Sequence, residues 1–234
     1  MHKAVSRAIN KAGFSPEEID LIMAGDLLNQ CIGTSFGIRE LQIPFLGLYG
    51  ACSTMAESLL LASMTVSDGF ADKVVAMTSS HFASSERQYR FPLGYGGQRT
   101  PTSQWTVTGC GSVILTNDKN SLKESSPKIK VTSFTPGKIV DMAFKDSMNM
   151  GAAMAMAAMD TILANFRDLG VDETYYDKII TGDLGQIGRR LLLDYLIKAG
   201  YDIESRYMDC GIEIFRNETQ DTHAGGSGCG CAAS

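Results

Sequence analysis

The sequence predicts an α/β protein built from two pseudo-symmetric halves. Short apolar runs of strand length alternate with longer segments whose apolar residues recur at helical spacing. One helix–strand unit near the N-terminus recurs further along the chain, so that Gly13 corresponds to Gly170 at an offset of 157 residues (170 − 13). The triplet Gly-Asp-Leu at 25–27 recurs at 182–184 with the same offset. The alternation and the repeat together predict the fold class.

In the first copy, a helix with one apolar face comes before a strand. Val5, Ala8, Ile9 and Ala12 share that face, and Gly13 is placed to end the helix. Residues 15–18 (Ser-Pro-Glu-Glu) are typical of a helix cap with proline at the first helical position. The strand is expected over residues 19–24.

The second copy follows the same plan. Met154, Ala158, Ile162 and Phe166 share a helical face, and Gly170 ends the helix. The methionine-rich run at 148–159 is expected to be part of this buried helix and not a cofactor site. The strand is expected over residues 176–181.

Cys52 is expected at the first residue of a buried helix. An apolar run at 43–48 predicts a strand, residues 49–54 a tight turn, and the nearly all-apolar run at 55–64 a helix. Unpaired N–H groups and the positive end of the helix dipole lower a thiol pKa and attract anions. Cys52 is therefore either a nucleophile, the floor of an anion pocket, or simply a small buried residue. A second glycine-rich turn with cysteine, at 225–232, is its weaker counterpart in the other half.

The middle of the chain predicts two further strands and a long loop. A buried strand over 72–81 ends on His81, and another strand follows Gly111. The segment 82–103 contains Arg87, Arg90 and Tyr95, and connections of that length are usually functional or disordered. Residues 117–128 are charged and serine-rich, as in a linker. We expect the first half to span 1–118 and the second 128–234.

The composition excludes two classes of partner. The chain has 234 residues, of which 44% are hydrophobic and 20% charged, and its net charge is −5. With no basic patch, nucleic acid is not expected as a partner. No apolar run approaches the roughly 20 residues of a membrane span, and no signal-peptide pattern is present at the start. Six cysteines without a zinc-type spacing favour a reducing, cytoplasmic compartment.

Several motifs together resemble a known family. The region 50–54 (Gly-Ala-Cys-Ser-Thr) is similar to the nucleophile loop of thiolases and type III ketoacyl synthases. Within that superfamily the chain most resembles the stage V sporulation protein AD family. The resemblance is carried by the segments at 24–30, 50–54, 78–81, 86–88, 95–98, 181–184 and 224–229.

The resemblance implies a thiolase-like fold, with mixed sheets around buried helices, and a role in spore-forming bacteria. Members of the family are expected to bind dipicolinic acid (pyridine-2,6-dicarboxylate) and to help move it into the developing spore. The implied partners are other stage V sporulation proteins at the spore inner membrane, so a peripheral location there is the alternative to the cytoplasm. Whether the chain forms a homodimer is open. Compared with the family, the chain is expected to be a fragment that lacks the first strand and ends inside the second half's buried helix.

The same resemblance argues against catalysis. Type III synthases place a histidine after the strand that here ends at Thr181, whereas this chain has Asp183, and an acid near a thiol raises its pKa. Thiolases have Gly-His-Pro in the second glycine loop, where this chain has Gly228-Cys229-Gly230. We therefore expect a binder. The alternatives are an acyltransferase that uses Cys52 and a scaffold that binds no ligand.

The expected ligand-binding residues come from both halves: Cys52, His81, Asp26, Asp183, Arg87, Ser227, Gly228 and Cys229. Cys52 is expected at the bottom of a cavity rimmed by His81 and the glycine loop. Each has a plainer alternative: a structural histidine for His81, a solvated loop for Arg87, and helix capping for Asp26 and Asp183. Calcium is an optional companion of the ligand, approached by either aspartate. No cofactor and no dedicated metal site are expected.

Overall fold

The computed structural model describes two compact units. The described residues are 1–28, 31–81, 107–118, 129–146, 149–216, 218–220, 222 and 224–225. Of these, residues 1–81 and 107–132 belong to the first unit and the remainder, from 133 onward, to the second. Each unit is described by itself.

The first unit opens with helix α1 (His2–Ala12), which confirms the predicted amphipathic helix. Val5 and Ile9 are almost completely buried. Gly13 ends the helix with φ 88°, and its amide bonds back to the carbonyls of Ile9 and Asn10. This left-handed conformation is one that glycine adopts without steric penalty, so Gly13 is the C-cap that the sequence predicts.

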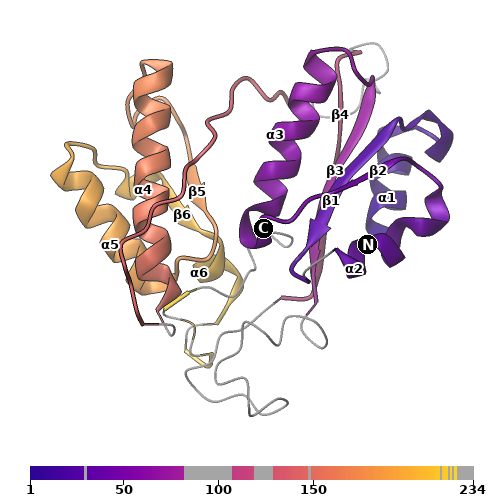
Figure 1. Cartoon of the computed structure of the whole chain (residues 1–234). Coiled ribbons are helices and arrows are strands. Elements are labelled where there is room, and N and C mark those ends of the chain that lie inside the picture. The colour runs from indigo at the N-terminus through magenta and orange to yellow at the C-terminus, as the bar shows by residue number, and fades with distance from the viewer. Residues whose placement is uncertain are drawn as a thin grey trace. The chain divides into compact units, whose positions relative to one another are not determined.

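A four-stranded mixed sheet forms the centre of the first unit. Its strands are β1 (Leu21–Asp26), β2 (Phe45–Gly47), β3 (Lys73–Ser80) and β4 (Gly109–Thr116), in the order β2-β1-β3-β4. β1 is parallel to both β2 and β3, and β4 is antiparallel to β3. Consequently the carboxyl ends of β1, β2 and β3 lie at one edge of the sheet (Figure 1).

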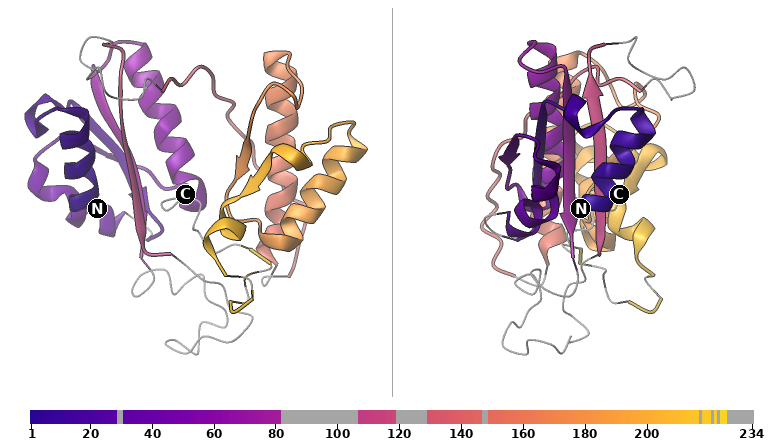
Figure 2. Two further views of the ribbon diagram at one scale, coloured as in Figure 1. Left: turned by 180° about the vertical axis from the view of Figure 1, so that it is seen from behind. Right: turned by 90° about the vertical axis from the view of Figure 1, so that its right-hand side faces the viewer.

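Helices cover both faces of this sheet (Figure 2). α1 and α2 (Ile32–Ile38) pack on one face, where Ile9, Ile22 and Val75 form the core. α3 (Thr54–Ser67) packs on the other face, where Ala62 and Val74 are fully buried. The exposed ends of these layers carry three short 3-10 helices: η1 (Pro16–Glu18), η2 (Arg39–Leu41) and η3 (Ala51–Ser53).

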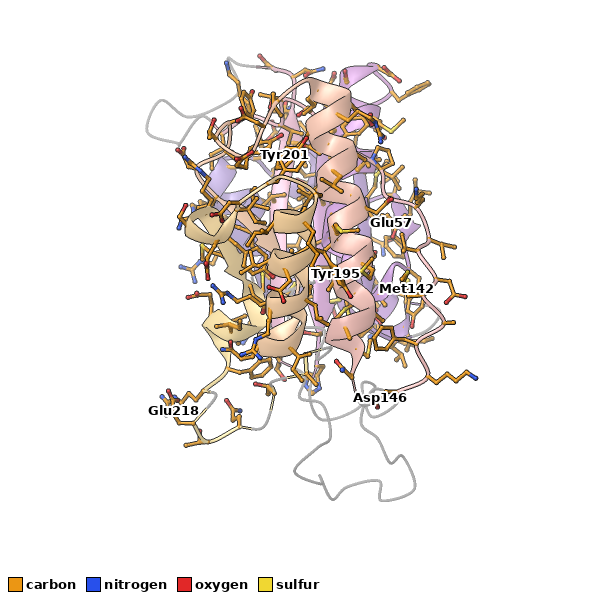
Figure 3. The ribbon with its side chains drawn as sticks, turned by 90° about the vertical axis from the view of Figure 1, so that its left-hand side faces the viewer. Glu57, Met142, Asp146, Tyr195, Tyr201 and Glu218 are labelled. Carbon is orange, nitrogen blue, oxygen red and sulfur yellow. The ribbon has the colours of Figure 1, made fainter. Side chains whose placement is uncertain are left out.

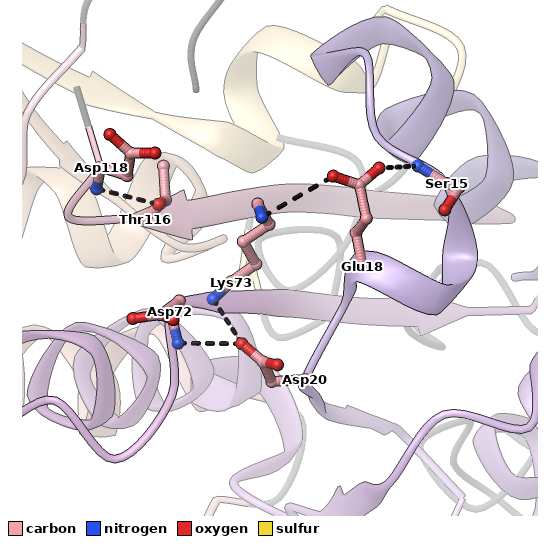
Figure 4. A network of polar contacts seen from close by, with 7 residues as sticks. All are labelled: Ser15, Glu18, Asp20, Asp72, Lys73, Thr116 and Asp118. Carbon is pink, nitrogen blue, oxygen red and sulfur yellow. Dashed lines mark hydrogen bonds and ion pairs between the residues drawn. The ribbon is translucent and has the colours of Figure 1, made fainter. Parts of the chain in front are cut away.

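A polar network ties together the starts of β1 and β3 (Figure 4). Asp20 accepts hydrogen bonds from the amides of Asp72 and Lys73, both at 2.9 Å. The Lys73 ammonium lies 3.8 Å from Glu18, whose other oxygen accepts the Ser15 amide at 2.8 Å. This last contact is half of a capping box, so the predicted cap at 15–18 exists, although it starts a 3-10 helix of three residues.

The second unit packs two long helices on a two-stranded sheet. Its elements are α4 (Met150–Leu169), β5 (Ile179–Thr181), α5 (Gly185–Lys198), η6 (Glu204–Arg206), β6 (Tyr207–Asp209) and α6 (Cys210–Ile214). β5 and β6 are parallel, with Ile179 opposite Tyr207. Leu192 and Leu196 of α5 are fully buried in the core. Tyr201, which follows α5 and is labelled in Figure 3, packs its ring on Phe166 of α4 with 5.0 Å between centroids.

The repeat predicted from the sequence is visible in the local structure of each unit. Gly170 ends α4 with φ 66°, as Gly13 ends α1. In each unit a parallel β–α–β segment follows, namely β1–α2–β2 and β5–α5–β6. The strand limits differ from the prediction, because β1 continues through Asp26 whereas β5 begins only at Ile179. β1 forms hydrogen bonds with β2 on one side and β3 on the other, and this pairing extends the strand to Asp26. The residues of β1 alone do not reveal which strands will pair with it.

Candidate functional site

The first candidate site is the edge at which β1, β2 and β3 end. Asp26 is the last residue of β1, the Cys52 turn follows β2, and His81 directly follows β3. In parallel α/β sheets, ligands bind outside the carboxyl ends of the strands. The strand order of the first unit thus gathers three of the predicted residues at one edge.

Gly25 permits the close packing that places the Cys52 turn. The Leu48 amide, just beyond β2, donates to the Ala24 carbonyl at 2.9 Å. A Cβ atom on Gly25 would overlap the Leu48 carbonyl oxygen and lie 2.8 Å from Cγ2 of Thr54. The backbone that leaves β2 therefore crosses directly over Gly25, and α3 starts against the same point.

Cys52 lies in a 3-10 turn and not at the first residue of the helix, which corrects the prediction. Residues 51–53 form η3, and α3 begins at Thr54. The Thr54 hydroxyl donates to the Ala51 carbonyl at 2.8 Å and accepts the Gly50 amide at 3.2 Å. Such short-range side-chain bonds favour a tight turn over the α-helix. Ala51 has φ 48°, a left-handed conformation that is unfavourable for alanine, and Cys52 is half-buried.

Asp26 is buried, and its carboxylate accepts hydrogen bonds from α2 and from the loop that comes before it. Oδ2 accepts the Thr34 amide at 2.6 Å and the Thr34 hydroxyl at 2.5 Å, and Oδ1 accepts the Leu28 amide at 2.7 Å. The amide of Thr34 is one of those at a helix N-terminus that has no partner within the helix. This geometry supports the helix-capping alternative for Asp26.

Two further groups at this edge were missed by the sequence reasoning. Cys31 is the N-cap residue of α2, and its thiol donates to the Leu48 carbonyl at 3.1 Å. Burial raises the pKa of the Cys31 thiol, and the nearby charges of Asp26 and Glu57 raise it further, so the thiol is held protonated. Glu57, in the first turn of α3, has a buried Oε2 without a hydrogen-bond partner among the described residues. The only signal for them in the sequence is that Cys31 comes shortly after Asp26 and Glu57 shortly after Cys52.

His81 is exposed at this edge, whereas the residue before it is fixed. The Ser80 hydroxyl donates to the Val107 carbonyl at 2.5 Å, which joins the end of β3 to the start of the β4 segment. Four other predicted ligand-binding residues, Arg87, Ser227, Gly228 and Cys229, lie outside the described residues.

The second candidate site is the corner at which β5 and β6 end and α5 and α6 begin. Asp183 is 4% exposed, and its carboxylate lies directly over Gly211, where a Cβ atom would overlap it. Asp209 is 2% exposed. Its Oδ2 accepts the Leu184 amide at 2.8 Å, and its Oδ1 accepts the Ile212 amide at 3.0 Å. Asp209 is therefore the N-cap of α6 and also accepts the amide of the residue that comes before α5. The sequence reasoning missed this residue.

Hydroxyl groups complete this corner. The hydroxyls of Tyr207 and Thr181 are 2.7 Å apart, and Tyr207 also donates to Asp209 Oδ2 at 3.3 Å. Burial raises the pKa of Asp209, and the amides of Ile212, Leu184 and Gly185 partly oppose that rise. Burial likewise raises the pKa of Tyr207. The corner thus contains two buried carboxyl groups, Asp183 and Asp209, and burial favours the protonated form of Asp209.

The entry to the glycine-rich loop packs against the same corner. Gly225 has φ 68°, and a Cβ atom there would lie 2.7 Å from the Asp183 carbonyl oxygen. The Gly151 amide at the start of α4 donates to the Ala224 carbonyl at 2.8 Å. The peptide at 183–184 thus supports the point from which the loop begins.

The described ranges contain neither a candidate metal-binding cluster nor a candidate membrane span. Among these residues, no three His, Cys, Asp or Glu side chains are grouped so as to hold a metal ion. In the same part of the chain, no helix combines the length and apolar character of a membrane span.

Comparisons with known proteins agree on one family and one fold. The model of the family described as stage V sporulation protein AD matches residues 1–234. The protein of that name from Bacillus subtilis (strain 168) is 43% identical over 233 residues, which is 100% of this chain and 67% of that protein.

Solved structures of condensing enzymes share the fold. AbyA1, a tetronic acid condensing enzyme, is 16% identical with a TM-score of 0.58, and the match covers 92% of this chain and 72% of that one. The 3-oxoacyl-[acyl-carrier-protein] synthase III from Aquifex aeolicus VF5 is 14% identical with a TM-score of 0.59, covering 88% and 66%. OleA from Xanthomonas campestris, with bound lauric acid and lauroyl-CoA, is 12% identical with a TM-score of 0.62, covering 89% and 66%. The predicted thiolase-like α/β fold is confirmed.

Proposed function

Because this chain belongs to the stage V sporulation protein AD family, and so is a sporulation protein with a thiolase-like fold, we propose that it binds dipicolinic acid without catalysing condensation. In this proposal, binding supports uptake of dipicolinic acid into the developing spore. The family is named for sporulation, whereas its fold neighbours are named as enzymes. The choice between binder and enzyme therefore depends on the residues at the strand ends.

The observation that carries the proposal is the buried pair of acids at the corner of the second unit. Condensing enzymes need a base or donor that stabilises a thiolate and a developing oxyanion. At the position where the resemblance predicts a histidine, this chain has the buried Asp183, and the amide of the next residue, Leu184, donates to the buried Asp209. Carboxylates disfavour a thiolate and do not stabilise an oxyanion unless they are protonated.

The charge of the ligand constrains how it is recognised. Dipicolinate carries two carboxylates on a flat ring and requires donors, a cation or both. Arg87 is proposed as the partner of one carboxylate. Asp183 and Asp209 repel a dianion, so we propose that calcium accompanies the ligand and that Asp183 approaches it. Calcium prefers carboxylate and carbonyl oxygens.

A calorimetric titration of the purified protein with dipicolinate, with and without calcium, tests the proposal. We expect saturable binding with one ligand per chain, tighter with calcium present. Pyridine-2-carboxylate, which lacks the second carboxylate, is the matched control and should bind at least about tenfold more weakly, a difference of about 1.4 kcal/mol. Absence of saturation under both conditions would refute the ligand assignment.

One observation favours a second candidate, an acyltransferase that uses Cys52. The thiol lies in a turn that leads directly into α3, and the fold neighbours are condensing enzymes. Incubation with acetyl- and malonyl-thioesters, followed by intact-protein mass spectrometry, distinguishes the two. Stable acylation or turnover that disappears in Cys52→Ala would establish the enzyme and overturn the binder.

A further inference from the structure

Thr54, the first residue of α3, is completely buried, and its side chain bonds to the backbone of the turn that contains Cys52. Its hydroxyl donates to the Ala51 carbonyl at 2.8 Å and accepts the Gly50 amide at 3.2 Å. Ser53, the N-cap residue of α3, makes no capping bond with its side chain. The hydroxyl of Thr54 therefore holds the turn before the helix and does not cap the helix itself.

The methyl group of Thr54 anchors the turn to the sheet. A Cβ atom on Gly25 would lie 2.8 Å from Cγ2 of Thr54, so the methyl group packs directly on the backbone of β1. One side chain thus joins a strand, through its methyl group, to the backbone of the turn, through its hydroxyl. Opening the turn would leave this buried hydroxyl without its partners, which is costly.

The conformation of Ala51 requires such a restraint. Its φ of 48° lies in the left-handed region, which alanine adopts only at an energetic cost. Its carbonyl is the one that accepts the Thr54 hydroxyl. Cys52 follows directly, so a return of Ala51 to an ordinary conformation would redirect the chain at Cys52 and move the thiol.

We propose that Thr54 is a positioning residue for Cys52: its hydroxyl holds Ala51 in the left-handed conformation and so sets the place and the exposure of the thiol. The inference goes beyond the proposed function and does not depend on it, because the thiol has to be held in place whether Cys52 lines a pocket or acts as a nucleophile. A purely structural role of Thr54 would lower the stability of the first unit without a separate effect at Cys52.

The rate at which iodoacetamide alkylates Cys52 reports the position of the thiol, because alkylation requires access to it. Peptide mass spectrometry of the folded protein measures this rate at Cys52 and at Cys110. Thr54→Val keeps the buried methyl group and removes the hydroxyl, whereas Thr54→Ser keeps the hydroxyl and removes the methyl group. Cys110, in β4 of the same unit, is the internal reference for general loosening of the structure.

Ser53→Ala is the matched control in the same turn. It removes a hydroxyl that donates to the Gly50 carbonyl at 2.8 Å. This hydrogen bond is exposed, so water can replace it, and the alkylation rate at Cys52 should change by less than about twofold.

We expect Cys52 to be alkylated about fivefold faster in Thr54→Val, the factor by which the loss of one hydrogen bond raises a local opening equilibrium. The rate at Cys110 should not change. In Thr54→Ser, which keeps both bonds to the turn, Cys52 should react at close to the wild-type rate.

Three results would overturn the positioning role: an unchanged rate at Cys52 in Thr54→Val, an equal acceleration at Cys52 and Cys110, or the same acceleration in Thr54→Ser as in Thr54→Val. Should Thr54→Val fail to fold, amide hydrogen exchange of the wild-type protein decides. Slow exchange at Gly50 supports the role, and exchange as fast as in an unstructured peptide overturns it.

Discussion

At the scale of single residues, aspartates at strand ends serve different purposes. Asp26 and Asp209 each accept two backbone amides and so stabilise the segments that follow their strands. Asp183, in the place that repeats Asp26, packs instead over Gly211. Equivalent positions in the two sequence copies therefore carry different local roles.

We expect Asp26→Ala to lower the free energy of unfolding by about 2 kcal/mol, because it leaves a buried helix amide without its acceptor. Urea denaturation followed by circular dichroism measures the change. Thr34→Val is the matched control, since it removes the hydroxyl bond of 2.5 Å but keeps the amide bond of 2.6 Å. A loss in Thr34→Val equal to that in Asp26→Ala would contradict the capping role.

Gly25 and Gly182 occupy equivalent positions in the repeat but should respond differently to alanine. In Gly25→Ala the new methyl group meets the Leu48 carbonyl, which belongs to the backbone and cannot move aside, so we expect a loss of about 3 kcal/mol or more. A methyl group on Gly182 meets nothing within 4 Å, so Gly182→Ala should change stability by less than about 1 kcal/mol. Thermal unfolding of both variants is the measurement, and similar midpoints would argue against the close packing at Gly25.

In the proposed binder, the size of the residue at 52 should matter and its nucleophilicity should not. Cys52→Ser should therefore bind dipicolinate within about threefold of the wild type, whereas Cys52→Trp should abolish binding by filling the half-buried position. Titrations under identical conditions compare the two. Equal effects of both substitutions would place the ligand elsewhere.

At the scale of elements, helix ends were the best predicted features. Gly13 and Gly170 both end their helices with φ in the left-handed region, at 88° and 66°. Neighbouring residues alone determine this geometry, because the cap bonds are made within the last turn. The repeat in sequence therefore becomes a repeat in local structure.

Alanine at either of these two caps should reduce stability by about 1 kcal/mol, the strain of placing a Cβ atom in the left-handed region. At Gly170 no other atom lies within 4 Å of the added methyl group, so the effect there is purely conformational. Chemical denaturation of Gly13→Ala and Gly170→Ala tests this, with Gly182→Ala as the reference. Stabilisation by either cap substitution would contradict the assigned backbone conformation.

At the scale of the whole molecule, buried acids make stability depend on pH. Burial raises the folded-state pKa of Asp209 above its ordinary value of 3.8. At pH values between 3.8 and the raised pKa, Asp209 therefore binds a proton more readily in the folded protein than in the unfolded chain. The contribution of Asp209 to stability is greatest below this window and declines as pH rises through it.

The difference in unfolding free energy between the wild type and Asp209→Asn should accordingly decrease as pH rises from about 3.8 and become constant above the raised pKa. Urea denaturation of both proteins across this pH range measures the difference. The contributions of other titrating groups cancel in it, because the two proteins share those groups. An increase in the difference with rising pH would mean that the hydrogen bonds lower the pKa of Asp209 by more than burial raises it.

The sequence by itself determined the α/β class, the repeat, the helix caps at Gly13 and Gly170, and the family to which the chain belongs. These features are local or are carried by motifs, so neighbouring residues and spacing suffice to recognise them. It also placed Asp26, Cys52 and His81 after strands, which the fold brings to one edge.

Only the tertiary structure decided which acid caps which helix and what surrounds Cys52. Asp209 reaches the Leu184 amide across 25 residues of chain, and Cys31 reaches the Leu48 carbonyl across 17. The place of the Cys52 turn over the end of β1 depends on Leu48 crossing Gly25, a contact between segments that are far apart in sequence. Such contacts depend on how strands are ordered and how closely their ends approach. Periodicity along the chain contains no information on either, because it reports only which face of an element is apolar.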